Sequence, residues 1–147
     1  MPVQGLRETR RILGPGGRLG TVTWAKELES KAGRIWTACL DAHGADELDV
    51  TMVRRHDLLN TPKKMEVLLR AAGFASIHAW ADDLATRIEL EPLLRLRTST
   101  GSSKPRFDSL SPCAQEACLA AARSRMAGLP SEDFVARGRV VYAVASV

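Results

Sequence analysis

The stretch RRILGPGGRLGTVTW, residues 10–24, decides how the beginning of the chain is interpreted. Apolar residues at helical spacing predict a helix over residues 3–13. Gly14 suits the left-handed position after a helix, and Pro15 forbids further helix and opens a tight turn. The β-forming run that follows is uncharged after its first residue, so it predicts a strand over residues 18–24, buried on both faces as in a parallel sheet.

The rest of the chain continues this alternation of helices and strands, which is typical of α/β layers. Two boundaries are well marked, because Thr61-Pro62 and Ser111-Pro112 each place an N-cap residue before a first-turn proline. The stretch 81–90 is ambiguous, and TRIEL within it could be another short strand. The other predicted elements are a helix over 28–43, a polar loop over 45–60, a helix over 61–72, a strand over 74–80, a short helix from Pro92 to 97, a long loop over 98–109, a helix from 112 to about 128, and a strand over 139–147.

The composition indicates one soluble domain. The chain has 147 residues, of which 45% are hydrophobic and 26% charged, as in ordinary globular proteins. Its apolar runs are too short for a membrane span, and no secretory segment follows the first residue, so a cytoplasmic protein is expected. We find no internal repeat and no linker, and therefore expect a single domain over residues 1–147.

The charged residues and the potential metal ligands argue against two classes of function. The net charge of +4 comes from basic residues scattered along the chain without aromatic residues between them, a pattern that argues against a nucleic-acid-binding domain. Three cysteines (Cys39, Cys113 and Cys118) match no zinc-ligand spacing, and the three histidines form no ligand pair. We therefore predict no metal site.

Four segments together resemble a known family. LRETRRILGPGGRLGTVTW resembles the segment after the fourth strand of class I S-adenosylmethionine-dependent methyltransferases, where a helix and a Pro-Gly-Gly turn precede the fifth strand. KKMEVLLRAAGFASIHAW looks like the family's next helix and sixth strand, joined by an Ala-Gly-Phe turn. RVVYAVASV is similar to the seventh strand, and LRTSTGSSKPRFDSL looks like the substrate-side insertion of small-molecule members.

The resemblance implies the C-terminal half of a Rossmann-like methyltransferase sheet. That half has three strands with flanking helices, and the last strand is antiparallel and central. The family's glycine turn and ribose-binding acid belong to the other half. The Gly14-Pro15-Gly16 stretch does not replace them, because Leu19 stands where a dinucleotide fingerprint needs glycine or alanine and the order of strand and helix is reversed.

The resemblance therefore implies a truncated methyltransferase that is inactive alone. S-adenosylmethionine is its cofactor by resemblance and is not expected to bind this chain, and the methyl acceptor would be a small molecule. The alternative is a non-catalytic interaction module. In that case strand 18–24 would lack a neighbour and leave an open edge, through which the chain would form a homodimer or pair with a partner chain.

Methyl transfer depends mostly on positioning the reacting groups, so no catalytic pair is required. Thr23 and Trp24 would lie at the carboxyl end of the first strand, where α/β sheets bind ligands, although Trp24 could equally be core. Trp36 could line an acceptor pocket or pack in the core. His56 could take a proton from an acceptor hydroxyl or be simply solvated, and Arg106 could contact an anionic acceptor or belong to a mobile loop.

Overall fold

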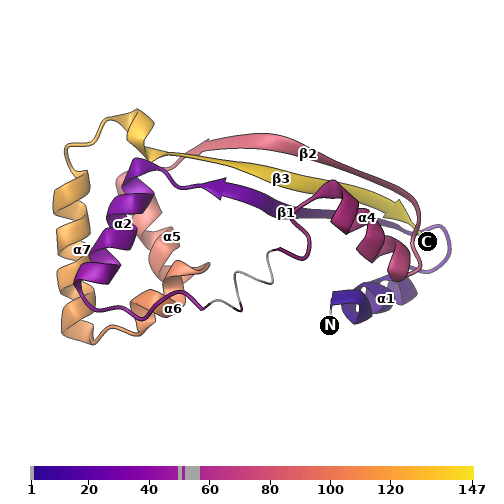
Figure 1. The fold of residues 1–147 in the computed structure, drawn as a ribbon, viewed down its shortest axis with the longest axis horizontal. Helices are drawn as coiled ribbons and strands as arrows, with labels where there is room; N and C mark the ends of the chain where they lie inside the picture. The colour runs from indigo at the N-terminus through magenta and orange to yellow at the C-terminus, as the bar shows by residue number, and fades with distance from the viewer. Residues whose placement is uncertain (1, 50, 52–56) are drawn as a thin grey trace. The chain divides into compact units, whose positions relative to one another are not determined.

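The structure is a computed structural model that describes residues 2–49, 51 and 57–147. Its contacts divide the chain into two compact units (Figure 1), each built from separate stretches of sequence. Unit 1 comprises Met1–Glu27, Val53–Leu84 and Gly138–Val147, and unit 2 comprises Leu28–Met52 and Ala85–Arg137.

Three strands form an open antiparallel sheet: β1 (Arg18–Leu28), β2 (Ala75–Arg87) and β3 (Val135–Ser146). Their order is β1-β3-β2, so the last strand of the chain lies between the other two. The register follows from cross-strand contacts. Val147 N donates to Gly17 O at 2.9 Å, and Arg139 pairs with Asp83 at 3.8 Å. The predicted topology, with a central antiparallel last strand, is confirmed.

Two helices of unit 1, α1 (Pro2–Leu13) and α4 (Pro62–Ala71), cover one face of the sheet. Alternate residues of β3 face them, and these residues are Val141, Ala143 and Ala145. Met65 and Leu69 of α4 are fully or nearly fully buried against this face. The small alanine side chains let the helices approach the sheet closely, and the burial of apolar surface stabilises the layer.

The turn between α1 and β1 forms as the sequence predicts. Gly14 and Gly16 adopt φ of 67° and 76°, values that favour glycine. Gly14 N donates to Arg10 O and Gly17 N donates to Gly14 O, each at 3.2 Å. The side chain of Arg10 then ties α1 to the end of α4, because its Nε donates to Gly73 O at 2.8 Å.

Unit 2 is helical. The mutual packing of its helices buries Trp36, Leu40, Leu94 and Cys118, and the Trp36 ring lies 5.8 Å from that of Phe107. The elements of unit 2 are α2 (Lys31–Ala42), α5 (Leu90–Ser99), α6 (Ser103–Asp108), α7 (Pro112–Met126) and the 3-10 helix η1 (Ser131–Phe134).

The predicted helix starts are confirmed at two prolines. Thr61 Oγ1 accepts from Lys64 N at 3.3 Å, and Ser111 Oγ accepts from Ala114 N at 3.4 Å, each with proline in the first turn. The helix predicted over 28–43 instead begins at Lys31, where Ser30 caps it by accepting from Gly33 N at 3.0 Å.

The prediction that the first strand is buried on both faces is wrong. Val22 and Trp24 are 59% and 44% exposed, because α1 and α4 cover one face of the sheet and these two side chains point to the other. The strand also continues past residue 24 to Leu28. Its alternation of half-buried and exposed residues is that of an antiparallel sheet with one open face.

Two other boundaries differ from the prediction. Residues 81–87 continue β2, so TRIEL does not form a separate strand. The long loop predicted over 98–109 contains the helix α6. Its Phe107 is buried beside Trp36, and an exposed ion pair between Lys104 and Asp108 supports its single turn. A polar, glycine- and serine-rich composition does not reveal this one buried anchor.

Among the described residues, no helix is both long enough and apolar enough to cross a bilayer.

The buried face of α4 provides a test of the unit 1 core. Leu69→Ala removes a side chain that is 0% exposed, and we expect it to lower the free energy of unfolding by about 2–5 kcal/mol. Val67→Ala on the exposed side of the same helix is the matched control, with an expected change within about 0.5 kcal/mol. Urea unfolding of the three proteins measures both values. Equal midpoints would contradict the placement of α4 on the sheet.

Candidate functional site

The face of the sheet opposite α1 and α4 carries a stack of three aromatic rings. His78 and Trp80 are two residues apart on β2, so both point to this face. Their ring centroids lie 5.1 Å apart, with an interplanar angle of 26°. Tyr142 of the neighbouring β3 stacks on Trp80 at 5.4 Å and 18°. Trp80 is therefore the middle ring of the stack, and each contact restricts the side chains that make it.

Trp24 extends this aromatic surface to the strand β1. Trp24 points to the same side, and its ring lies over Gly138, where an added Cβ would come within 3.0 Å of Trp24 Cζ3. Val22 and Val144 add exposed apolar surface. We call the surface formed by Trp24, His78, Trp80 and Tyr142, with these two valines, the aromatic face.

The outer edge of β1 is the second feature of unit 1. The order β1-β3-β2 places β1 and β2 at the two edges, and within the part of the chain that the structure describes no strand pairs with the outer side of β1. Residues 19–24 carry no charge and no proline, the usual devices that prevent edge pairing. The charged residues of β1 (Arg18, Lys26 and Glu27) stand at its two ends, whereas those of β2 (Asp82, Asp83 and Arg87) stand in its second half. The uncharged middle of the β1 edge is thus suited to pairing with another strand.

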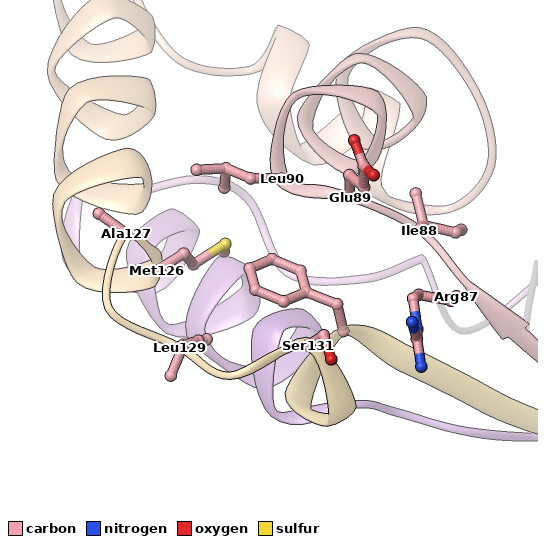
Figure 2. Close-up of a pocket in the computed structure, with 9 residues that line it drawn as sticks. Arg87, Ile88, Glu89, Leu90, Met126, Ala127, Leu129 and Ser131 are labelled. Carbon is pink, nitrogen blue, oxygen red and sulfur yellow. The ribbon is translucent and has the colours of Figure 1, made fainter.

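Unit 2 contains a pocket of about 250 Å³ where β2 ends, α5 begins and α7 is followed by η1 (Figure 2). Its apolar floor includes the buried Met126 and the half-buried Leu90 and Leu129. Three exposed polar residues stand at its rim, Arg87, Glu89 and Ser131. An apolar concavity with a few polar groups is the usual form of a small-molecule site. The other lining residues are Ile88, Ala127 and Phe134.

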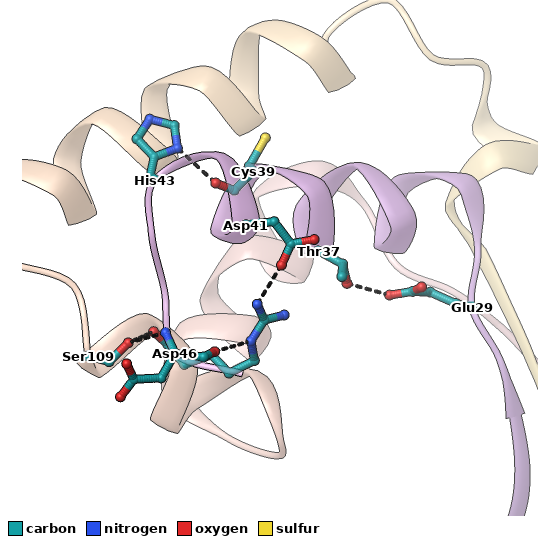
Figure 3. A network of polar contacts seen from close by, with 8 residues as sticks. Glu29, Thr37, Cys39, Asp41, His43, Asp46 and Ser109 are labelled. Carbon is teal, nitrogen blue, oxygen red and sulfur yellow. Dashed lines mark hydrogen bonds and ion pairs between the residues drawn. The ribbon is translucent and has the colours of Figure 1, made fainter. Parts of the chain in front are cut away.

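Arg106 holds unit 2 together by polar contacts (Figure 3). Its Nη2 lies 2.5 Å from Asp41 Oδ1, and its Nε donates to Asp46 O at 2.7 Å. Ser109 Oγ accepts from Asp46 N at 2.9 Å. With its side chain 13% exposed, Arg106 links α6 to the end of α2. Its guanidinium is engaged by these partners, which favours the structural role over contact with an anionic acceptor.

The structure does not bring the other predicted site residues into one site. Thr23 and Trp24 lie within β1 and not at its carboxyl end, because the strand continues to Leu28, so their predicted position is wrong. Thr23 is half-buried, whereas Trp24 belongs to the aromatic face. Trp36 is 0% exposed in the core of unit 2, as its core interpretation requires. His56 lies outside the described residues.

The stack of His78, Trp80 and Tyr142 was missed by the sequence analysis. A signal was available for the first two, since His78 and Trp80 alternate on a predicted strand and must share a face. Tyr142 has no local signal, because its position beside Trp80 depends on the register of β3 against β2.

The glycine turn does not fit the cofactor that the family resemblance implies. It follows a helix and precedes a strand, and its amides of Gly14 and Gly17 are already bonded to carbonyl oxygens of the turn and of α1. A Cβ on Gly17 would lie 2.7 Å from Leu13 Cβ, so this glycine serves close packing of the turn. The turn has no free row of amides to hold an anionic group.

The cysteines are free and differ in exposure: Cys39 and Cys118 are buried, and Cys113 is exposed. Burial raises the pKa of the Cys118 thiol to about 11, and neighbouring Cys39 adds to this increase. Within the described ranges, no group of three or more potential ligand side chains could hold a metal ion.

Comparison with known proteins places the chain in no family: no protein-family model matches it, and no curated protein matches it.

The difference between the cysteines predicts a stepwise reaction with a thiol reagent. At pH 8 one thiol of the native protein should react with the reagent, and this is the thiol of exposed Cys113. Cys118, with a pKa of about 11, is about one part in a thousand thiolate at that pH and is also shielded. Cys39 is shielded by burial. All three cysteines should react in denaturant, as measured by absorbance of the released chromophore, and rapid reaction of Cys118 in the native protein would contradict the packing of α7.

Proposed function

We propose that this chain forms the acceptor-side half of a class I S-adenosylmethionine-dependent methyltransferase and is inactive alone. The strand order carries the proposal: β3, the last strand, lies antiparallel between β1 and β2. The family resemblance requires this arrangement, and it is unusual because the last strand must insert between two strands that were formed earlier in the chain. Local sequence preference alone does not select it.

Two further observations support the proposal. The helix, glycine turn and strand of α1 and β1 follow the order expected after the family's fourth strand, and Gly73 takes φ of 92° in the turn expected before the sixth. Helices α5, α6 and α7 lie between β2 and β3 in the chain, where small-molecule members of the family carry their insertion. The pocket in unit 2 is the candidate site for a small acceptor there.

The cofactor half of such an enzyme would come from residues other than those described here, since the glycine turn does not fit S-adenosylmethionine. The chain's own contribution is positioning, which is the main requirement of methyl transfer. On this proposal it supplies an apolar acceptor pocket and a strand edge that continues the sheet.

Titration with S-adenosylmethionine tests this assignment. We expect no saturable heat by calorimetry at micromolar cofactor and no rise in melting temperature, because a ligand that binds the native state must stabilise it. S-adenosylhomocysteine, the product that lacks the sulfonium charge, is the matched second ligand and should behave in the same way. A saturable isotherm with either ligand would show that the chain holds the cofactor itself and would overturn the half-enzyme proposal.

The second candidate function is a non-catalytic module that pairs with another chain through the edge of β1. The observation favouring it is the exposure of Val22 within the uncharged stretch 19–24 of an edge strand. Main-chain pairing at such an edge needs no particular partner sequence, so a second copy of this chain can serve.

Substitution at the edge tests this candidate. The wild-type chain should self-associate in a concentration-dependent way, measured by sedimentation or light scattering. Val22→Lys places a charge on the edge strand at an exposed position, and we expect it to weaken association roughly tenfold or more. Val67→Lys, on the exposed side of α4, adds the same charge away from the edge and should associate like the wild type.

A wild-type chain that stays monomeric at high micromolar concentration would refute pairing through β1. Equal weakening by the two lysine variants would assign the effect to net charge and would refute it as well.

A further inference from the structure

We propose that the aromatic face of unit 1 binds single-stranded nucleic acid, with bases stacking on its rings and phosphates held by nearby basic side chains. This site is separate from the proposed acceptor pocket and does not depend on the methyltransferase proposal. Its evidence is the geometry of the rings together with the distribution of charge between the two units.

The rings form a platform suited to unpaired bases. In the stack, His78 and Tyr142 each have one ring face against Trp80, so the outer faces of these two rings are where a base would extend the stack. Trp24 presents a further indole ring, 44% exposed, on the neighbouring strand β1. Open sheet faces with aromatic side chains bind unpaired bases in this way, and every base has a planar face that can stack.

The positive charge of the chain is concentrated on the same unit. Among the described residues, unit 1 has 9 lysines and arginines against 6 acidic residues, whereas unit 2 has 10 against 11. The described part of unit 1 therefore has a net charge of +3, and that of unit 2 has a net charge of −1. Six of the basic residues of unit 1 lie on α1 and α4, which cover the opposite face of the sheet, so the excess attracts a polyanion to the unit as a whole, and phosphates at the aromatic face are contacted only by the basic residues of that face.

Two basic residues stand on the aromatic face itself. Arg18 and Lys26 lie an even number of residues from Val22 and Trp24 on β1, so all four side chains point to the same side of the sheet. Both basic residues are exposed. Asp82 is the acidic residue at the corresponding positions of β2. Phosphates are therefore expected along β1, and bases along the row from Trp24 towards His78.

The origin of these residues from distant parts of the chain explains why the sequence pattern argues against nucleic-acid binding. The basic residues of unit 1 come from three separate stretches of the chain, and its four aromatic-face rings come from three different strands. Folding gathers both sets into one unit. A protein partner would also be drawn to exposed apolar side chains, but the excess of positive charge favours a polyanion.

Tryptophan fluorescence provides the experiment. The probe is a single-stranded oligothymidylate titrated into the full chain, with a duplex of equal length as the comparison. We expect saturable quenching of Trp24 and Trp80, while Trp36, which is 0% exposed, keeps its emission. Duplex of the same length should bind more weakly, because its bases are not free to stack. In a plot of the logarithm of the binding constant against the logarithm of the salt concentration, the slope should be roughly −1.4 for two phosphate contacts.

Four variants separate the contributions. Trp80→Ala removes the middle ring and should weaken binding roughly tenfold or more, whereas Trp80→Phe keeps a stacking ring and should retain most of the affinity. Lys26→Ala should lower the salt slope by about 0.7 with the fold unchanged. Leu96→Ala, at an exposed apolar residue of unit 2, is the matched control and should bind like the wild type.

Absence of quenching, affinity independent of salt, or wild-type binding by Trp80→Ala would each overturn the proposal. Lys26→Ala and Trp80→Phe keep it testable if Trp80→Ala does not fold, as judged by circular dichroism. Light scattering on the same samples detects the competing outcome. Self-association that is lost in Trp80→Phe and Trp80→Ala, without oligonucleotide binding, would assign the aromatic face to contact between copies of the chain and refute the nucleic-acid site.

Discussion

The pairing of β3 with both other strands is the constraint on which unit 1 depends. β3 (Val135–Ser146) comes from the end of the chain, yet it lies between two strands that end at Leu28 and Arg87, far earlier in the sequence. Neither β1 nor β2 has another strand partner in the described chain, so the sheet exists only when β3 is in place. The contacts that hold it are long-range, and their loop-closure cost must be met by burial of Val141, Ala143 and Ala145 under the helices.

The alternation of side chains on β3 also separates the two faces of the sheet. Small residues face α1 and α4, which can then pack closely, and Tyr142 and Val144 point to the other side. A shift of the register by one residue would put alanines on the open face and the tyrosine under α4. The aromatic face is thus a consequence of the same alternation that builds the core.

The two units provide different kinds of surface. Unit 2 buries Trp36 and Phe107 and has a small apolar pocket, with Arg106 engaged in holding its helices together. Unit 1 keeps Trp24 and Trp80 exposed and carries the positive charge of the chain. The proposed small-molecule site and the proposed polyanion site therefore lie in different units, and each can be tested without the other.

The sequence by itself determined the elements whose signals are local. Gly14 and Pro15 end α1, and Thr61-Pro62 and Ser111-Pro112 start α4 and α7. The order β1-β3-β2 has no local signal, and it was predicted only by the resemblance of the chain's segments to a known family. Caps and turns are set by residues a few positions apart, so a single sequence suffices for them.

Tertiary structure alone decided the features that depend on distant residues. The open face of β1 follows from which side of the sheet the helices cover, and the helix α6 follows from a buried contact between Phe107 and Trp36. The structure likewise showed that Arg106 is occupied by Asp41 and that Trp80 stacks on Tyr142. In each case the partner lies far along the chain, and local pattern carries no information about which distant side chain a residue will meet.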